Sequence, residues 1–220
     1  MDYSEIIHEE FFDEKSLKEL NIQLYSCNKV KYLVLDNFFK ENFLNNLYKE
    51  VKLNYSIQTW STEWRMIQLT IWKYSRIFYE FYNSKKLSRA LSVIIWEKIK
   101  IENHIWKSNA TKFFWEILKK MWCFLRKNNI WSSLWWHTDG PVEKTVGSFI
   151  IYLNKEWSKW DGWELELWVF QKENIISYKS ISPSFNRVVI LKTEESISWH
   201  RVTEVKNQDR LFFHDQLLKV

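Results

Sequence analysis

The periodicity of hydrophobic and polar residues differs between the two halves of this chain. In the first half, apolar residues such as Phe43, Leu44, Leu47 and Val51 recur three and four positions apart. This spacing places them on one face of a helix. The same helical spacing of apolar residues occurs twice more before residue 100. We therefore predict three helices, over 37–54, 75–84 and 86–100.

Short segments rich in β-branched and aromatic residues follow one another from about residue 112, with turn signals between them. Such segments are typical of strands, and many of them at regular spacing favour a sandwich or barrel over βαβ units. Two earlier strands are predicted at 31–36 and 65–72. The later strands are predicted at 112–119, 121–127, 134–138, 146–154, 163–170, 174–181, 187–193, 197–203 and 209–217.

These elements predict an α+β fold that is mainly a β core. A chain of 220 residues is long enough for one domain with a sizeable core. Residues 1–30 are polar and amphipathic, and we expect a short helix or an extended arm there. The domain is then expected over 31–220, with supporting helices at about 37–110 and the β core at about 111–220.

Charge and cysteine content narrow the classes of function. The 32 basic and 27 acidic residues are mixed along the chain, and no dense basic block suggests a nucleic-acid partner. Cys27 and Cys123 cannot form a disulfide framework, which favours a reducing, cytoplasmic compartment. Residues 1–13 lack an apolar signal core, and no run approaches roughly 18 apolar residues, so no membrane span is expected. Oligomeric state is left open.

Tryptophan and glycine occur in abnormal proportions, with 15 tryptophans and 3 glycines. An average chain is roughly 7% glycine, so about 15 would be expected in this length. Trp131 stands in a loop-like stretch, and Trp163 follows Gly162 at a turn, where a bulky indole is a poor choice. We hypothesise that many of these tryptophans are glycines in the natural protein, encoded by a UGA codon that its ribosomes read as glycine. A genuinely tryptophan-rich protein is the alternative.

His137, Asp139 and His200 form a candidate set of metal ligands. Strand residues i and i+2 point to one face, roughly 6.5–7 Å apart, so His137 and Asp139 could share a metal. His200 would arrive from another predicted strand. Two histidines and one carboxylate leave coordination positions open for a co-substrate and O2, which is diagnostic of non-haem Fe(II) oxygenases. Unrelated histidines and an ordinary turn aspartate are the alternative.

Arg210 lies ten residues after His200. If 197–203 and 209–215 form an antiparallel hairpin centred near Val205, the two side chains fall about opposite each other on one face. The guanidinium could then grip the carboxylate of a metal-chelating 2-oxo acid. A surface cation at a hairpin end is the alternative. The remaining histidines have no such neighbours and are predicted to be non-functional: His8, His104 and His214.

The stretch 137–210 resembles the core of the 2-oxoglutarate/Fe(II)-dependent dioxygenases, in their prolyl 4-hydroxylase-like branch. The H-x-D motif, the distal histidine and the later arginine carry the resemblance. Residues 161–165 are similar to the branch's DGGEL turn, with Trp163 in place of the second glycine. The likeness covers about 110–220 and extends more loosely from about residue 30. Further similar segments are 146–154, 181–183, 186–190 and 199–202.

The resemblance implies a double-stranded β-helix, a cupin-like jelly-roll of two facing sheets with a metal at its mouth. It implies that His137, Asp139 and His200 bind Fe(II) and that Arg210 binds the distal carboxylate of 2-oxoglutarate. Tyr152 would donate a hydrogen bond to 2-oxoglutarate, or is simply a core aromatic. The implied activity is hydroxylation of an unactivated C–H bond, with release of succinate and CO2. A prolyl residue of a protein or peptide is the implied substrate, and ascorbate an implied further requirement.

Two other functions stay open at this point. The same chemistry could act on a small molecule or an alkylated base. Alternatively, the chain could be a non-catalytic metal-binding β-sandwich module. The complete triad, with Asp139 in place, argues against the module and against a halogenase. The sequence does not identify the substrate, because the region 55–110 that would hold the selecting lids matches poorly.

Overall fold

The computed structural model describes residues 3–26, 29–53, 55–59, 65–70, 73–101, 120–128, 134–137, 144–171, 174–193, 199–206 and 210–220. No helix in these ranges is long and apolar enough to span a membrane. The helices are η1 (Glu9–Phe11), α1 (Glu14–Ser26), α2 (Glu41–Leu53), α3 (Lys73–Tyr82), α4 (Lys85–Ile95) and η2 (Lys159–Asp161). The strands are β1 (Tyr32–Asp36), β2 (Tyr55–Thr59), β3 (Arg65–Thr70), β4 (Ile99–Ile101), β5 (Lys120–Asn128), β6 (Leu134–His137), β7 (Thr145–Tyr152), β8 (Leu165–Gln171), β9 (Asn174–Ile181), β10 (Arg187–Lys192), β11 (Trp199–Val202) and β12 (Arg210–Lys219).

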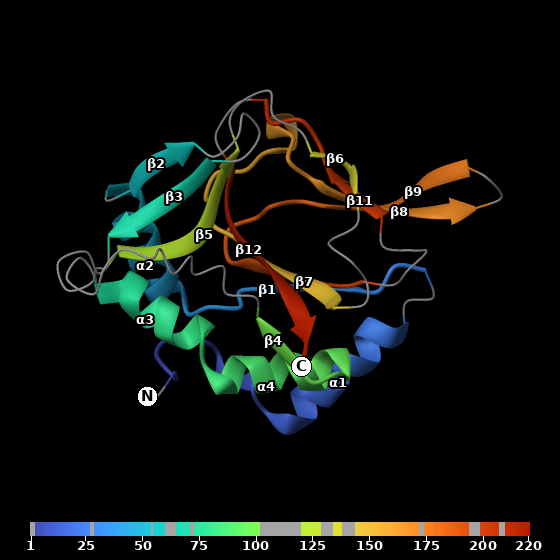
Figure 1. Ribbon diagram of the computed structural model, residues 1–220, viewed down its shortest axis with the longest axis horizontal. Helices are drawn as coiled ribbons and strands as arrows, with labels where there is room; N and C mark the ends of the chain where they lie inside the picture. The colour runs from blue at the N-terminus through green and yellow to red at the C-terminus, as the bar shows by residue number, and fades with distance from the viewer. Residues whose placement is uncertain are drawn as a thin grey trace.

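Two antiparallel sheets form the β core (Figure 1). The larger sheet has the order β1-β10-β7-β12-β5-β3-β2, with β4 paired to β12, and the smaller has the order β6-β11-β8-β9. The chain passes back and forth between the sheets, so that β7, β10 and β12 lie in one and β6, β8, β9 and β11 in the other. This is the arrangement of a jelly-roll, and the predicted fold class is confirmed.

Strand β7 shows how the larger sheet is buried on both of its faces. All eight of its residues are buried. Phe149 and Ile151 join the apolar cluster under the helices, whereas Ile150 and Tyr152 join the cluster between the two sheets. Because neither face meets solvent, polar and apolar residues do not alternate along the strand, and its second half leads into the apolar run 149–153.

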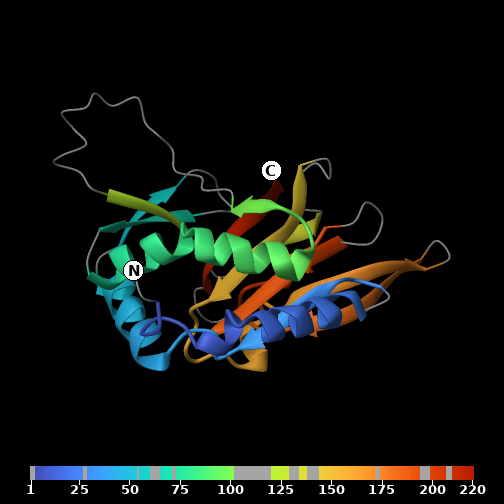
Figure 2. The same cartoon turned by 90° about the horizontal axis from the view of Figure 1, so that it is seen from below.

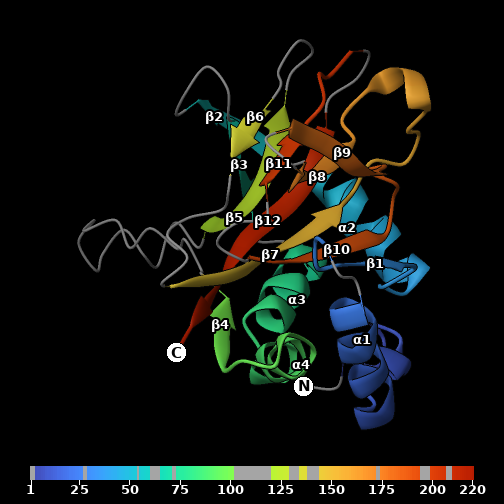
Figure 3. The same cartoon turned by 90° about the vertical axis from the view of Figure 1, so that its right-hand side faces the viewer.

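Helices α1, α3 and α4 cover the outer face of the larger sheet (Figure 3). α1 and α4 pack side by side (Figure 2). Phe78 of α3 stacks on Phe213 of β12 with ring centroids 4.5 Å apart, which joins the helical layer to the sheet. Ser84 caps α4 by accepting a hydrogen bond from the backbone N–H of Leu87.

The structure differs from the sequence prediction at two places, and a third predicted element is not tested. The helix predicted over 86–100 ends at Ile95, because Trp96 takes a left-handed backbone conformation and the chain turns into β4. β2 was not predicted; among the described strands, its five residues pair with β3 alone, at the edge of the sheet. The strand predicted over 112–119 lies outside the described residues.

Glu97 links the helical layer to the larger sheet. It follows α4 and pairs with Lys192 of β10 at 3.3 Å and with Lys219 of β12 at 3.1 Å. Partial burial opposes ionisation of this carboxyl, but the hydrogen bonds from Lys219 and Lys192 outweigh it and hold the pKa of Glu97 below its usual value of 4.5. The ionised form therefore stabilises the fold above that pH, and its contribution is lost as the pH falls through the lowered pKa.

We predict that Glu97→Gln lowers the free energy of unfolding at pH 7 by about 0.5–1 kcal/mol, because two lysines lose a shared anionic partner. The difference from the unmodified protein should shrink as the pH falls below 4.5. Urea unfolding at several pH values measures it. Glu14→Gln is the control, since Glu14 forms an ion pair with the exposed Lys18 on the surface of α1. Equal effects of the two substitutions at pH 7 would contradict the linking role.

Candidate functional site

The positions of His137 and His200 are brought together by the pairing of β6 with β11. The register places His200 directly opposite His137. Cross-strand partners share a face of their sheet. The side chain of His200 is 5% exposed, and Val202, two residues further on, belongs to the apolar cluster between the sheets. Position 137 therefore shares the inner face of the smaller sheet with a buried imidazole.

His200 is also fixed on its other side. It pairs with Leu167 of β8, so β11 is held between two neighbouring strands at this position. A side chain on such a central strand is placed more rigidly than one on a loop. An imidazole is a suitable ligand for Fe(II), and a second histidine with one carboxylate would complete the usual donor set.

The third predicted ligand, Asp139, lies outside the described residues, and the side chain of His137 is not described. Among the residues that the structure does describe, no three histidines, cysteines or carboxylates gather to hold a metal ion. Because Asp139 is not among them, the predicted triad stays a prediction.

The predicted hairpin between His200 and Arg210 is wrong. β11 belongs to the smaller sheet, whereas Arg210 begins β12 in the larger one, where it pairs with Asn128 of β5. Arg210 nevertheless occupies a position on the same face of β12 as Phe212, which packs in the cluster between the sheets. Positions 200 and 210 therefore lie on two different sheets that face the same apolar core, rather than on neighbouring strands.

The hairpin is excluded by the contacts of residues 203–206, the described part of the connector between β11 and β12. The backbone N–H of Thr203 donates to the carbonyl of Glu164 at 3.0 Å, and that of Lys206 donates to Asp161 at 2.9 Å. Val205 forms a β-bridge with Gly162. The connector is therefore bound by the turn 161–164 and crosses between sheets, instead of folding back as a hairpin.

Asn154 holds the beginning of β12, and sequence reasoning did not single it out. Tyr152 is the last residue of β7 to pair with β12, opposite Phe212. Beyond it the Leu153 N–H donates to the Leu211 carbonyl at 3.0 Å, and the Leu211 N–H donates to the buried Asn154 side-chain oxygen at 2.9 Å. An amide directly after an apolar strand is the only local sign of this role.

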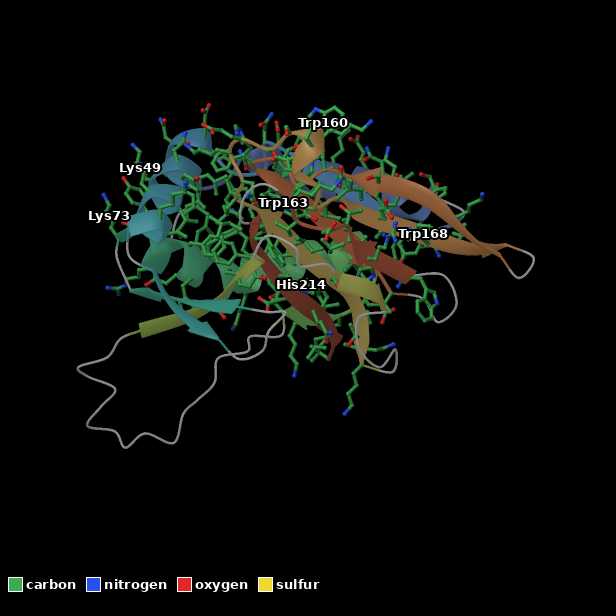
Figure 4. All side chains as sticks on the ribbon, turned by 90° about the horizontal axis from the view of Figure 1, so that it is seen from above. Lys49, Lys73, Trp160, Trp163, Trp168 and His214 are labelled. Carbon is green, nitrogen blue, oxygen red and sulfur yellow. The ribbon has the colours of Figure 1, made fainter. Side chains whose placement is uncertain are left out.

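Tyr152 is fully buried in the cluster between the sheets. Because Phe212 is its direct partner, Tyr152 is a diagonal neighbour of position 210, a relation that places Cα atoms about 7–8 Å apart. His214, which was predicted to be non-functional, is also buried and lies opposite Ile150 in the same pair of strands. Figure 4 shows His214 within the β core.

The sequence model of the 2OG-Fe(II) oxygenase superfamily matches residues 127–214. This segment includes β6 and β11, the strands that carry His137 and His200, as well as Tyr152 and Arg210. No curated protein shows significant sequence similarity to the chain.

Solved structures show the same fold. A prolyl 4-hydroxylase of Pseudomonas putida superposes with a TM-score of 0.63 at 12% identity, over 93% of this chain and 99% of that one. A prolyl 4-hydroxylase of Phytophthora capsici gives 0.62 at 20% identity, over 96% of this chain and 65% of that one. A prolyl hydroxylase of Trichoplax adhaerens, in complex with a peptide fragment of hypoxia inducible factor, gives 0.61 at 13% identity, over 93% and 91%. Residues 127–214 are thus similar to the 2OG-Fe(II) oxygenase superfamily, and the chain has the fold of these prolyl hydroxylases.

Proposed function

We propose that this chain is a 2-oxoglutarate- and Fe(II)-dependent dioxygenase that hydroxylates an unactivated C–H bond of a prolyl residue in a protein or peptide. The observation that carries the proposal is the register of β6 and β11, which sets the buried His200 opposite position 137 inside the matched segment. The prolyl substrate is supported by the fold that the chain shares with prolyl hydroxylases, one of them bound to a peptide. In the balanced reaction, one oxygen atom of O2 enters the hydroxyl group and the other enters succinate, while CO2 leaves 2-oxoglutarate.

In this proposal His137, Asp139 and His200 hold Fe(II) by two imidazoles and one carboxylate. When bound, the metal supplies the activation of O2 that the protein's own side chains cannot provide. The protein contributes the placement of the ligands. His200 is fixed by strands on both sides, and its imidazole is buried away from bulk water.

Arg210 is proposed to bind the distal carboxylate of 2-oxoglutarate. A guanidinium matches a carboxylate with two parallel hydrogen bonds, which fixes the orientation of the acid as well as its position. Tyr152, the diagonal neighbour, is proposed to donate a further hydrogen bond to it. Asn154 supports both by fixing the backbone beside Arg210.

The direct test is succinate release from 2-oxoglutarate in the presence of Fe(II), O2 and a library of proline-containing peptides. We expect succinate formation that depends on both metal and peptide, and a peptide product heavier by one oxygen atom. Peptide-independent turnover that a small molecule or an alkylated base stimulates would contradict the peptide substrate. Iron binding without any turnover would contradict the enzymatic proposal. Ascorbate dependence stays a prediction, tested by omitting ascorbate.

His200→Ala should abolish both Fe(II) binding and succinate release, because two remaining ligands cannot hold the metal in the required geometry. Metal content after anaerobic loading and the succinate assay measure the two losses. His8→Ala is the matched control, since His8 lies in the N-terminal segment before η1. Retention of stoichiometric iron by His200→Ala would exclude it as a ligand.

Arg210→Ala should raise the concentration of 2-oxoglutarate needed for half-maximal turnover by about 10- to 100-fold, the loss expected for hydrogen bonds to a charged group. Iron content should not change. Arg201→Ala is the control, because Arg201 pairs with Glu166 instead. An unchanged 2-oxoglutarate requirement in Arg210→Ala would refute the assignment.

Asn154→Ala should destabilise the fold by about 1–3 kcal/mol, because the buried Leu211 N–H loses its acceptor. We also expect a higher 2-oxoglutarate requirement, since the backbone next to Arg210 is no longer held. Asn154→Asp keeps an acceptor oxygen and should restore the 2-oxoglutarate requirement. Chemical unfolding and turnover assays measure the two effects separately. If Asn154→Ala is destabilised but needs no more 2-oxoglutarate, Asn154 does not position Arg210.

A further inference from the structure

Two tryptophans adopt a backbone conformation that bulky residues rarely take. Among the described residues, four that are not glycine have a positive φ: Asn37, Trp96, Trp163 and Asn186. Asparagine tolerates this region because its short side chain bonds locally, so two of the four need no explanation. For a bulky residue a positive φ is a genuine outlier. Both outliers are tryptophans, in a chain with 15 tryptophans and 3 glycines.

Trp96 stands at the end of α4, at φ 61° and ψ 29°. Its backbone N–H donates to the Ser92 carbonyl, and the Glu97 N–H donates to the same oxygen at 3.2 Å. This left-handed helix ending is the position at which glycine is the default residue. The indole is 77% exposed, so little packing offsets the backbone strain.

Trp163 has φ 74° directly after Gly162 with φ 75°. Two successive positive φ values are the pattern of a Gly-Gly turn. The turn is tightly enclosed, since a Cβ added at Gly162 would lie 1.9 Å from the Glu204 carbonyl oxygen. Trp163 itself is 0% exposed, and its indole N–H has no hydrogen-bond partner among the described residues. A buried indole N–H normally finds one.

We propose that positions 96 and 163 are glycine in the natural protein, each encoded by a UGA codon that is read there as glycine. The backbone strain at both positions and the unpaired indole at position 163 then disappear together. The proposal does not depend on the dioxygenase activity. It does concern the site, because the turn 161–164 binds the connector that leads from His200 to Arg210.

Thermal unfolding of single variants tests the conformational argument. Trp96→Gly should raise Tm by about 2–4 °C. Glycine adopts the left-handed conformation without strain, and the exposed indole contributes little buried surface that the substitution would lose. Trp160→Gly is the matched control: Trp160 is 79% exposed but sits in the helical turn η2, where glycine is unfavourable, so Tm should not rise. Figure 4 shows Trp160 at the edge of the molecule and Trp163 inside it. Equal shifts in the two variants would overturn the proposal for position 96.

Trp163→Gly separates the two possibilities more sharply. If tryptophan is natural there, removing a fully buried indole leaves a cavity and should lower Tm by roughly 10 °C or more. If glycine is natural there, Tm should stay the same or rise. A large decrease, or a variant that fails to fold, would overturn the proposal for position 163.

The coding DNA and the natural protein give an independent test that does not require any variant to fold. We expect UGA at codons 96 and 163. Mass spectrometry of tryptic peptides from the source cells should then find the residue mass of glycine at both positions. UGG codons, or peptides that carry tryptophan at these positions, would overturn the proposal whatever the unfolding experiments show.

Discussion

The apolar layer between the two sheets is the constraint on which the rest of this structure depends. Tyr152 and Phe212 enter it from the larger sheet, and Leu167 and Val202 enter it from the smaller one. Because these side chains fill the space between the sheets, β11 and β12 cannot slide past each other without opening the core. The separation of His200 from Arg210 is therefore fixed by packing rather than by the short chain that connects them.

The second apolar layer, under the helices, stabilises the same strands from outside. β7 contributes to both layers, and Phe213 of β12 stacks on α3 from the outer side while Phe212 packs inward. The strands that carry Tyr152 and Arg210 are thus buried on both faces. Rigidity of this kind would suit the proposed site, whose protein groups must keep their geometry.

Most of the β core could be predicted from the sequence, because strands buried on both faces leave short apolar runs, such as 149–153 in and after β7. The pairing of strands could not. Proximity in sequence favoured a hairpin between His200 and Arg210, whereas the connector is bound by a turn formed long before it in the chain. No local pattern encodes that contact. The spacing of the motif did identify His137 and His200 together as candidate ligands, and the strands that carry them are neighbours.

The bridge between Gly162 and Val205 also bears on how this protein can change in evolution. Surface loops usually accept insertions easily. Here the turn and the connector share backbone hydrogen bonds, and the Glu164 carboxylate accepts one more from the Thr203 hydroxyl at 2.6 Å. An inserted residue in either segment would break the register of the other. We therefore expect their lengths to vary in concert among related chains, while loops that lack such a partner vary independently.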